Sequence, residues 1–533
     1  MSTMLPYNNA VLKLSKRAET HNPQHIIDSF VDVGHLFSLL SNPDNQIIFG
    51  RRGTGKTHVL TYLSSELSRK GTLTTQLDMR TIGSTGGLYS DQKIPLAERA
   101  TRLLVDTLAA IHDQVINHVL KDTEKLDLSI LSPLLDNFIE TATNLIVVGD
   151  VEQETTQSTN NSFTANDNFN MDLSSTPRIQ VGTGAAESTS SNSNFRVKTA
   201  GRQRLRIQFG PLTRDLQRLI QALPAQKLWI ILDEWSEVPL DLQPYLADLL
   251  RRSIIPVKGI TVKIAAIEQR CNFRINDDAA GHIGIEIGAD AAASISLDEF
   301  LVFDNNPEQA KQFFAELLYR HIVSIAKTEP DIPPPSSISD LTSTLFTQVT
   351  ALEEFTRASE GVPRDAINII GLAAQKAPSN PISVQDIRSA SRTWYTRAKQ
   401  QAISTKPQAQ KLLNWIIDEV IKHRQARAFL LEVGVRDDLI DFLYDARVLH
   451  VIRQGVSSQD HAGRRFNVYA LDYGCYVDLI NTTRAPQGLF EATPIENDIA
   501  QECFVNVPHT DFRSIRRAIL DLSEFYKSID HHL

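Results

Sequence analysis

The chain has 533 residues, which is too long for one ordinary domain and predicts several folded units. Hydrophobic residues make up 42% and charged residues 22%, as in globular proteins, and this excludes a disordered or fibrous chain. The net charge of −9 provides no general attraction to nucleic acid, so such a contact would need a local basic surface. Cys271, Cys475 and Cys503 are too far apart in sequence for a disulfide framework, which predicts a cytoplasmic protein. We expect no membrane segment, because no run reaches about 18 apolar residues and no signal peptide is evident.

Residues 1–45 are predicted to form an N-terminal segment that is irregular as far as about residue 25. Apolar residues then recur at helical spacing over 26–41 and predict one short helix. We expect this helix to pack beside the loop that follows it.

Residues 46–60 (QIIFGRRGTGKTHVL) have the features of a phosphate-binding loop. An apolar strand leads into G-x-x-x-x-G-K-T, and an amphipathic helical pattern follows. The glycines allow the backbone N–H groups to face phosphate oxygens, and the helix that starts near Lys56 directs its positive end at them. Lys56 is predicted to reach the β- and γ-phosphates, and Thr57 to bind Mg²⁺. The predicted nucleotide-binding residues are Gly50, Arg51, Arg52, Gly53, Thr54, Gly55, Lys56, Thr57 and His58.

The alternative, a plain glycine turn between a strand and a helix, is disfavoured because the motif and its flanking pattern agree. Residues 46–300 are therefore predicted to be a P-loop ATPase core. The expected elements are strands at 72–79 and 204–209 and helices at 96–120, 128–143 and 211–222. Within this core, residues 151–200 are rich in Ser, Thr and Asn and predict a low-complexity insertion that forms a mobile loop.

A buried strand at 228–232 ends in Asp233 and Glu234. In a parallel sheet, residues at the carboxyl ends of the strands face the ligand, so Asp233 would complete the Mg²⁺ site. Glu234 would polarise the attacking water. The alternative is a buried strand followed by an acidic helix cap, which the upstream loop makes a weaker interpretation.

The next predicted strand, 259–267, follows a helix at 243–252 and ends in Glu268 and Gln269. Both residues are candidates for contact with the γ-phosphate. A polar strand end in contact with water explains them equally well.

Residues 301–405 are predicted to form a helical lid. Gly361 ends one helix, and Pro363 occupies the first position of the next. Arg364 then lies on a first turn, where a cation opposes the helix dipole and a nearby γ-phosphate would offset that cost. The alternative is an arginine that is solvated or paired with Asp365.

Residues 406–485 suggest a winged helix: helices at 409–423, 426–432 and 435–445, then a hairpin of strands at 448–455 and 466–474. Arg464 and Arg465 would lie on the wing, where they could contact phosphate. Four acidic residues in the neighbouring helical region argue against deep reading of the major groove: Asp437, Asp438, Asp441 and Asp445. The tail, 486–533, contains one predicted helix at 511–528.

This order of motifs resembles AAA+ ATPases of the origin-recognition/initiator clade and the related STAND ATPases. The resemblance implies an α/β fold, with a P-loop parallel sheet, a helical lid and a C-terminal winged-helix-like domain. It makes Lys56 and Thr57 the Walker A pair, and Asp233 and Glu234 the Walker B pair. Arg364 matches the sensor 2 arginine. Glu268 or Gln269 lies at sensor 1, where the family more usually has Asn.

The resemblance also implies an oligomer in which a neighbouring subunit supplies an arginine: Arg251, Arg252 or Arg270. The implied cofactors are ATP and Mg²⁺, with Glu234, Lys56 and Arg364 as the catalytic residues of a slow hydrolysis. The first predicted function is an ATP-driven switch of conformation or assembly that acts on double-stranded DNA. The alternative is a STAND-like signalling switch or scaffold that binds a protein partner. A basic surface formed by five residues would favour DNA, and an apolar groove there would favour a protein: Arg388, Arg392, Arg397, Lys399 and Arg465.

Overall fold

The computed structural model describes most of the chain. The described residues are 4–14, 23–32, 34–82, 89, 91–122, 126–143, 145–156, 194–205, 207–277, 281–291, 293–298, 306–424, 426, 428–435, 437–457, 463–477 and 518–530. They form two compact units, of which the larger comprises 1–142 with 208–533 and the smaller is 143–207.

The larger unit contains a five-stranded parallel sheet with the strand order β2-β5-β6-β1-β9. The strands are β1 (Gln46–Phe49), β2 (Leu73–Asp78), β5 (Leu228–Asp233), β6 (Ile260–Ala266) and β9 (Ala293–Ser296). Every residue of β1, β5 and β6 is buried, as expected for parallel strands covered on both faces. Because all five strands run in the same direction, their carboxyl ends form one edge, and the glycine-rich loop leaves that edge after β1.

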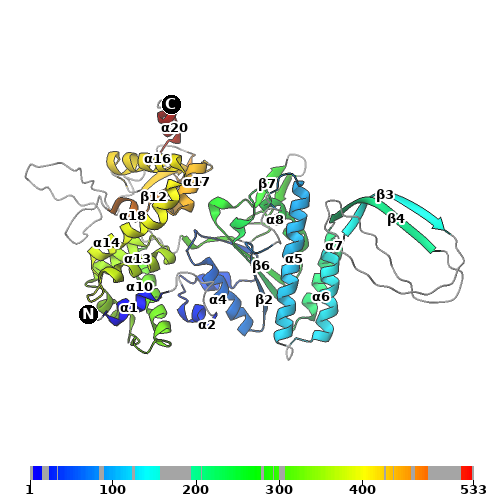
Figure 1. The fold of residues 1–533 in the computed structure, drawn as a ribbon, viewed down its shortest axis with the longest axis horizontal. Helices are drawn as coiled ribbons and strands as arrows, with labels where there is room; N and C mark the ends of the chain where they lie inside the picture. The colour runs from blue at the N-terminus through cyan, green and yellow to red at the C-terminus, as the bar shows by residue number, and fades with distance from the viewer. Residues whose placement is uncertain are drawn as a thin grey trace, which may run out of the picture. The chain divides into compact units, whose positions relative to one another are not determined.

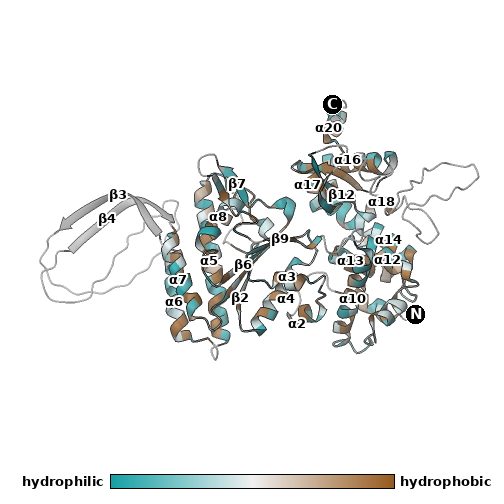
Figure 2. Cartoon of the chain, turned by 180° about the vertical axis from the view of Figure 1, so that it is seen from behind, coloured by the Kyte–Doolittle hydropathy of each residue, from teal (hydrophilic) through white to brown (hydrophobic). Residues whose placement is uncertain are grey.

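Amphipathic helices cover this sheet (Figure 1). Helices α3 (Leu36–Leu40) and α4 (Lys56–Arg69) bury apolar side chains against β1, β5 and β6. Helix α5 (Leu96–Lys121) contacts β2 and α8 (Gln243–Ser253), while α6 (Leu128–Ala142) lies between α5 and α7 (Phe209–Ala222). Figure 2 shows both apolar and polar faces on α5 and α6. These helices confirm the α/β class, and in the described part of the chain none is long and apolar enough to cross a membrane.

The N-terminal segment differs from its prediction. Residues 6–12 were expected to be irregular but form helix α1 (Pro6–Leu12), which packs on the lid helix α13 (Pro363–Lys376). Asn8 lies within this contact, where its amide Nδ2 donates to the carbonyl oxygen of Asn380 at 3.0 Å. The single helix expected over 26–41 is two helices, α2 (Pro23–Ser29) and α3, because Gly34 and His35 adopt positive φ angles of 54° and 63°.

The lid is helical, as predicted. Its helices are α10 (Pro307–Ala326), α11 (Ile338–Leu345), α12 (Val349–Ala358), α13 and α14 (Val384–Trp394), followed by a π-helical stretch at Tyr395–Gln400 and α15 (Gln401–Ser404). Apolar side chains of α1, the lid and the C-terminal domain form one continuous hydrophobic core. The lid and the C-terminal domain therefore fold against each other.

The C-terminal domain contains a three-stranded antiparallel sheet with the order β10-β12-β11. Its elements are α16 (Pro407–Ile416) with a π-helical turn at Ile417–His423, β10 (Ala428–Glu432), α17 (Asp438–Asp445), β11 (Leu449–Ser457), β12 (Arg465–Leu471) and α18 (Tyr473–Tyr476). The hairpin was predicted correctly. The helix predicted at 426–432 is wrong, because Ala428 to Leu431 are all buried and pair with β12 as a strand.

The chain returns to this domain at its C-terminal end. Leu430 of β10 forms a parallel bridge with Ile519, and α20 (Leu522–Asp530) follows. The predicted tail helix at 511–528 therefore starts later than expected among the described residues. Arg513, Arg516 and Arg517 lie outside them.

The smaller unit is an antiparallel ribbon. Strand β3 (Leu145–Thr156) pairs with β4 (Asn194–Leu205) along its whole length. The predicted loop over 151–200 is therefore wrong at both ends, and its middle, 157–193, lies outside the described residues. Of the strand predicted at 204–209, only residues 204 and 205 lie in a described strand, because β4 ends at Leu205 and α7 begins at Phe209.

Candidate nucleotide-binding site

The loop after β1 has the conformation that its glycines require. Gly53 and Gly55 have φ angles of +92° and +93°, a region that L side chains rarely adopt. At Gly50, a Cβ atom would lie 2.5 Å from the Thr54 hydroxyl. Helix α4 begins at Lys56, so its unpaired N–H groups face the cavity of the loop. The loop therefore has the shape of an anion-binding site.

Lys56 lies inside this loop. Its side chain is buried, and Nζ donates to the carbonyl oxygens of Gly50 at 2.7 Å and Arg51 at 3.1 Å. Burial lowers the pKa of Lys56, while the carboxylates of Glu234 and Asp233 oppose that shift. A phosphate would supply the negative charge that such a buried ammonium lacks.

The predicted Mg²⁺ ligands lie next to each other. The Thr57 hydroxyl donates to Asp233 Oδ2 at 2.7 Å, and the Glu234 N–H donates to Asp233 Oδ1 at 2.8 Å. Burial raises the pKa of Asp233, against the hydrogen bond from Thr57. A hydroxyl with one carboxylate fits Mg²⁺, which usually binds one or two carboxylates together with substrate phosphates.

Glu234 occupies a strained backbone position. Its φ of 55° lies in the left-handed region, which costs free energy for a residue other than glycine and is found most often at functional sites. Burial raises the pKa of Glu234, and Lys56 opposes that rise. A carboxylate with a raised pKa at the edge of the sheet is suited to general-base chemistry.

The lid contacts the glycine-rich loop directly through Arg364. The N–H of Arg364 donates to the carbonyl oxygen of Gly53 at 3.2 Å, and a Cβ at Gly53 would lie 2.8 Å from Cβ of Arg364. The positive charge of Arg364 contributes to the lowered pKa of Lys56. Asp365 forms 2.8 Å ion pairs with Lys399 and Arg447. The structure therefore places Arg364 next to the loop, and contact of its side chain with a γ-phosphate stays a prediction.

A pocket that the sequence interpretation missed opens beside Gly55. It is lined mainly by apolar side chains from α3, α4, α10 and the segment after α2, together with two histidines: Ser29, Phe30, Val31, Leu36, Thr54, Gly55, His58, Val59, Leu297, Phe313, Leu317, His321 and Pro363. His58 was predicted to bind the nucleotide, and its Nε2 bonds the carbonyl oxygen of Ile26 at 2.8 Å. The apolar stripe over 26–41 was the available signal for this pocket.

The sensor 1 candidates lie in a short 3-10 turn, Glu268–Arg270. The Glu268 carboxylate accepts a hydrogen bond of 2.6 Å from Gln454 of β11, and Arg270 pairs with Asp445 of α17 at 2.8 Å. Both contacts connect the end of β6 to the C-terminal domain. Contact of Glu268 or Gln269 with a γ-phosphate stays a prediction.

The two arginines of the loop have different surroundings. Arg52 is partly exposed and pairs with Glu237 at 2.6 Å. Arg51 is 1% exposed, and its Nε donates to Asp298 at 2.8 Å. Asp298 had no signal in the sequence, because it lies 247 residues from Arg51.

The candidates for an arginine acting in a neighbouring subunit lie at the end of α8 and after β6. Arg251 and Arg252 both pair with Asp248 at 2.7 Å, and their side chains are 26% and 52% exposed. Arg270 is held by the C-terminal domain, as described above. Of the three, Arg252 has the greatest exposure.

A glycine-rich loop between a buried strand and a helix, at the carboxyl edge of a parallel sheet, has the features of a P-loop, and a helical lid contacts it. Residues 14–82 match the ORC-CDC6-like family model, which confirms the resemblance to the origin-recognition clade for that part of the chain. Among solved structures, one match is the Orc1 protein of Aeropyrum pernix in complex with DNA. The two chains are 13% identical, the match covers 85% of this chain and 93% of that one, and the TM-score is 0.30. No curated protein matches the chain.

Proposed function

We propose that this chain is a cytoplasmic AAA+-type ATPase that uses binding and slow hydrolysis of ATP–Mg²⁺ to switch its conformation or assembly. One observation carries the proposal: Lys56, Thr57, Asp233, Glu234 and Arg364 come from three separated parts of the sequence and converge around one loop. The match of residues 14–82 to the ORC-CDC6-like family supports the same class.

Each residue then has a physical role. Lys56 would leave the carbonyl oxygens of its own loop and donate to the β- and γ-phosphates. Thr57 and Asp233 would hold Mg²⁺, which neutralises the charge that develops on the phosphates. Glu234 would orient and deprotonate the attacking water, and Arg364 would contact the γ-phosphate from the lid.

The apolar pocket beside Gly55 would receive the nucleobase. It lies at the start of α4, on the same side as the phosphate loop, and includes Pro363 of the lid. A base bound there would contact the N-terminal segment, the core and the lid together. ATP would therefore join all three parts.

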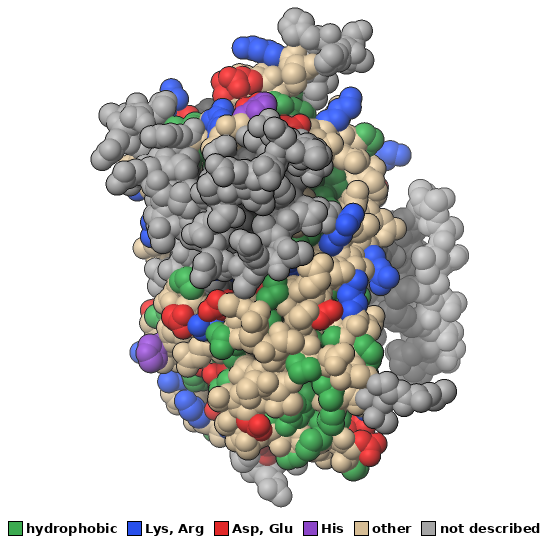
Figure 3. Space-filling model, turned by 90° about the vertical axis from the view of Figure 1, so that its left-hand side faces the viewer, with side chains coloured by type: hydrophobic (Ala, Val, Ile, Leu, Met, Phe, Trp, Pro, Cys, Tyr) green, Lys and Arg blue, Asp and Glu red, His purple; other side chains and the backbone are tan. Residues whose placement is uncertain are grey.

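For the target, we propose double-stranded DNA bound through the exposed wing arginines Arg464 and Arg465. Figure 3 shows Lys and Arg side chains spread over the visible face, with Asp and Glu among them. Two of the five basic residues expected to mark a DNA surface are buried instead. Arg388 pairs with Glu354 at 2.6 Å, and Lys399 pairs with Asp365 at 2.8 Å.

That burial favours a second candidate, a STAND-like switch that binds a protein partner. Helix α17, which would lie near a DNA groove in a winged helix, packs against the ATPase core through Asp445 and Tyr444. Its acidic side chains would also repel DNA phosphates.

The test is to measure the ATPase rate and the molecular mass, each with and without duplex DNA. Wild type should hydrolyse ATP slowly and form larger species with ATP than with ADP. Glu234→Gln should keep ATP binding and lose turnover by about 100-fold or more. A rate and mass that respond to DNA favour the first candidate, and a DNA-independent ATP response favours the second. An inactive chain that binds no ATP would contradict both.

A further inference from the structure

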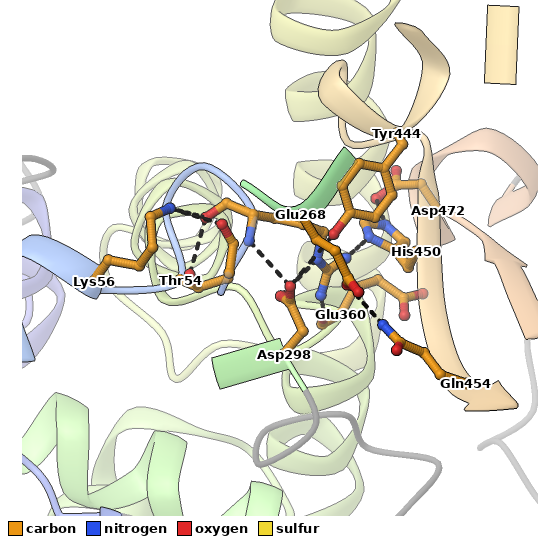
Figure 4. Close-up of polar contacts among 11 residues, drawn as sticks. Thr54, Lys56, Glu268, Asp298, Glu360, Tyr444, His450, Gln454 and Asp472 are labelled. Carbon is orange, nitrogen blue, oxygen red and sulfur yellow. Dashed lines mark hydrogen bonds and ion pairs between the residues drawn. The ribbon is translucent and has the colours of Figure 1, made fainter. Parts of the chain in front are cut away.

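Arg51 is the one loop residue whose side chain leaves the nucleotide site and contacts every neighbouring domain. Its Nε donates to Asp298 Oδ1 at 2.8 Å in the core, and its Nη2 donates to the carbonyl oxygen of Glu360 at 3.1 Å in the lid. Its Nη1 donates to Nδ1 of His450, on strand β11 of the C-terminal domain. Figure 4 shows Asp298, Glu360 and His450 close together beside the loop that carries Lys56.

The two partners of His450, Arg51 and Asp472, favour one tautomer of its ring. An arginine can only donate, so Nδ1 of His450 must be the acceptor and Nε2 must carry the proton. Nε2 then donates to Asp472 Oδ2 at 3.0 Å. Both side chains of this second pair are 3% exposed. His450 therefore acts as an oriented bridge between a buried cation and a buried carboxylate.

The chain of contacts continues into the lid and returns to the loop. Asp472 pairs with Lys399, which also pairs with Asp365 at 2.8 Å, and Arg447 contacts the other oxygen of Asp365 at 2.8 Å. Asp365 directly follows Arg364, whose N–H bonds Gly53. A buried network thus runs from the phosphate loop through the C-terminal domain and back to the turn of the lid that carries Arg364.

Further contacts from the same domain reach the same edge of the sheet. Tyr444 of α17 donates to Asp298 Oδ2 at 3.5 Å, and this oxygen also accepts the backbone N–H of Arg51 at 3.0 Å. Gln454 of β11 donates to Glu268 at 2.6 Å. The C-terminal domain is therefore docked on the nucleotide end of the core.

We propose that Arg51 couples nucleotide binding to docking of the C-terminal domain, so that each stabilises the other. The proposal rests on the proposed ATP binding and adds that docking of the C-terminal domain strengthens it. Docking fixes the conformation of the loop, because Asp298, Glu360 and His450 all contact the Arg51 side chain. Lys56 in turn donates to the Arg51 carbonyl oxygen. A loop already held in this shape loses less freedom when phosphate binds.

Electrostatic interactions of Arg51 also indicate that nucleotide binding and docking of the C-terminal domain stabilise each other. Burial opposes the charge of Arg51, but Asp298, Tyr444 and Glu360 together outweigh it, so the pKa of Arg51 stands above its usual value and the guanidinium is a buried cation. Nucleotide phosphates in the loop add negative charge beside it and so favour the docked arrangement. By linkage, docking strengthens nucleotide binding by the same factor by which the nucleotide strengthens docking. A change that releases His450 should therefore weaken nucleotide binding.

The test is calorimetric titration of ATP–Mg²⁺ into wild type, His450→Leu, His450→Gln and a control, His423→Leu. His423 belongs to the same domain, but its side chain is 66% exposed and pairs with Glu419. His450→Leu should weaken ATP binding by about fivefold to tenfold, and His423→Leu should leave it unchanged. His450→Gln should recover part of the loss, because an amide can both accept from Arg51 and donate to Asp472.

A second measurement needs no variant. Amide hydrogen exchange of β11 in wild type should slow when ATP–Mg²⁺ is added, because the bound state docks the strand more firmly. Wild type that binds ATP with unchanged exchange in β11, or a folded His450→Leu with wild-type affinity, would overturn the coupling and leave ATP binding intact. A wild-type chain that binds no ATP would instead overturn the proposed function, and the coupling with it.

Discussion

The two ends of the parallel sheet each bury a lysine, and the two lysines have opposite surroundings. At the amino end, Lys263 of β6 donates to the carbonyl oxygens of Asn42 and Asp44 at 2.7 and 2.9 Å, and also to the Gln46 side chain. At the carboxyl end, Lys56 donates to two carbonyl oxygens of a glycine-rich loop, with the carboxylates of Asp233 and Glu234 nearby.

The difference distinguishes a structural lysine from the lysine that we propose binds the nucleotide. The acceptors of Lys263 tie the turn before β1 to β6, and its ammonium lies 4.9 Å from the Trp229 ring. The acceptors of Lys56 belong to a loop open to ligand, next to a strained Glu234 and a lid arginine. Burial alone therefore does not identify a functional cation; the groups around it do.

We expect the largest loss of nucleotide affinity from substitution of Lys56, and no loss from substitution of Lys263. Lys56→Ala should weaken ATP–Mg²⁺ binding by about 100-fold, because the phosphates lose charge-assisted hydrogen bonds inside a buried site. Lys263→Met should leave the affinity unchanged. Calorimetric titration of both variants checks the pair, and equal losses of affinity would remove the distinction between the two ends.

Lys263 also gives the folded protein a specific pH dependence. Burial lowers its pKa from 10.5 to about 7, against the charge of Asp44. Above pH 7 the unfolded chain binds more protons at this residue than the folded chain, so the unfolding free energy rises with pH towards 10.5. Between pH 7 and 9 the gain from this group is about 2 kcal/mol.

Urea unfolding of wild type and Lys263→Met at pH 7, 8 and 9 measures that gain. The difference in unfolding free energy between the two proteins should shift in favour of wild type as the pH rises. A difference that is constant over this range would show that Lys263 titrates normally.

At the carboxyl end, the raised pKa of Glu234 predicts that the ATPase activity falls on the acid side of its pH profile, and we call this fall the acid limb. Burial favours the protonated carboxyl, and only the carboxylate can accept a proton from water. The value of kcat/KM should therefore fall about tenfold per pH unit below that pKa, at a higher pH than an ordinary glutamate would give. The residual rate of Glu234→Gln should lack this limb; if it keeps the limb, another group is the base.

The smallest expected effect concerns the lid. Arg364→Ala should still bind ADP like wild type, but should lose about tenfold in affinity for ATP, because one charge-assisted pair with the γ-phosphate is removed. Competition titrations with ADP and a non-hydrolysable ATP analogue measure this. Equal losses for both nucleotides would place Arg364 on a phosphate other than the γ-phosphate.

The sequence predicted the parts of the site that local patterns encode. The loop from Gly50 to Thr57, the strand before Asp233 and the helix that begins at Pro363 each have a motif within a few residues. Their boundaries are close to the predicted ones because glycine, proline and buried apolar runs act over short distances.

The remaining parts depend on contacts that no local pattern contains. Arg51 and His450 lie 399 residues apart, and nothing in GRRGTGKT distinguishes Arg51 from the exposed Arg52. Lys399 was expected on a basic surface, but two carboxylates from distant segments allow it to be buried. Residues 426–432 were predicted as a helix because a short apolar run fits either period, and tertiary pairing with β12 decided for a strand.

Hydrogen exchange of the wild-type chain with and without ATP–Mg²⁺ shows both whether nucleotide binds and which segments it contacts. We expect saturable binding that slows exchange both in the phosphate loop, from Gly50 to Thr57, and in the first turn of α13 at Arg364. Absence of binding, or binding that leaves both segments unchanged, would contradict this expectation.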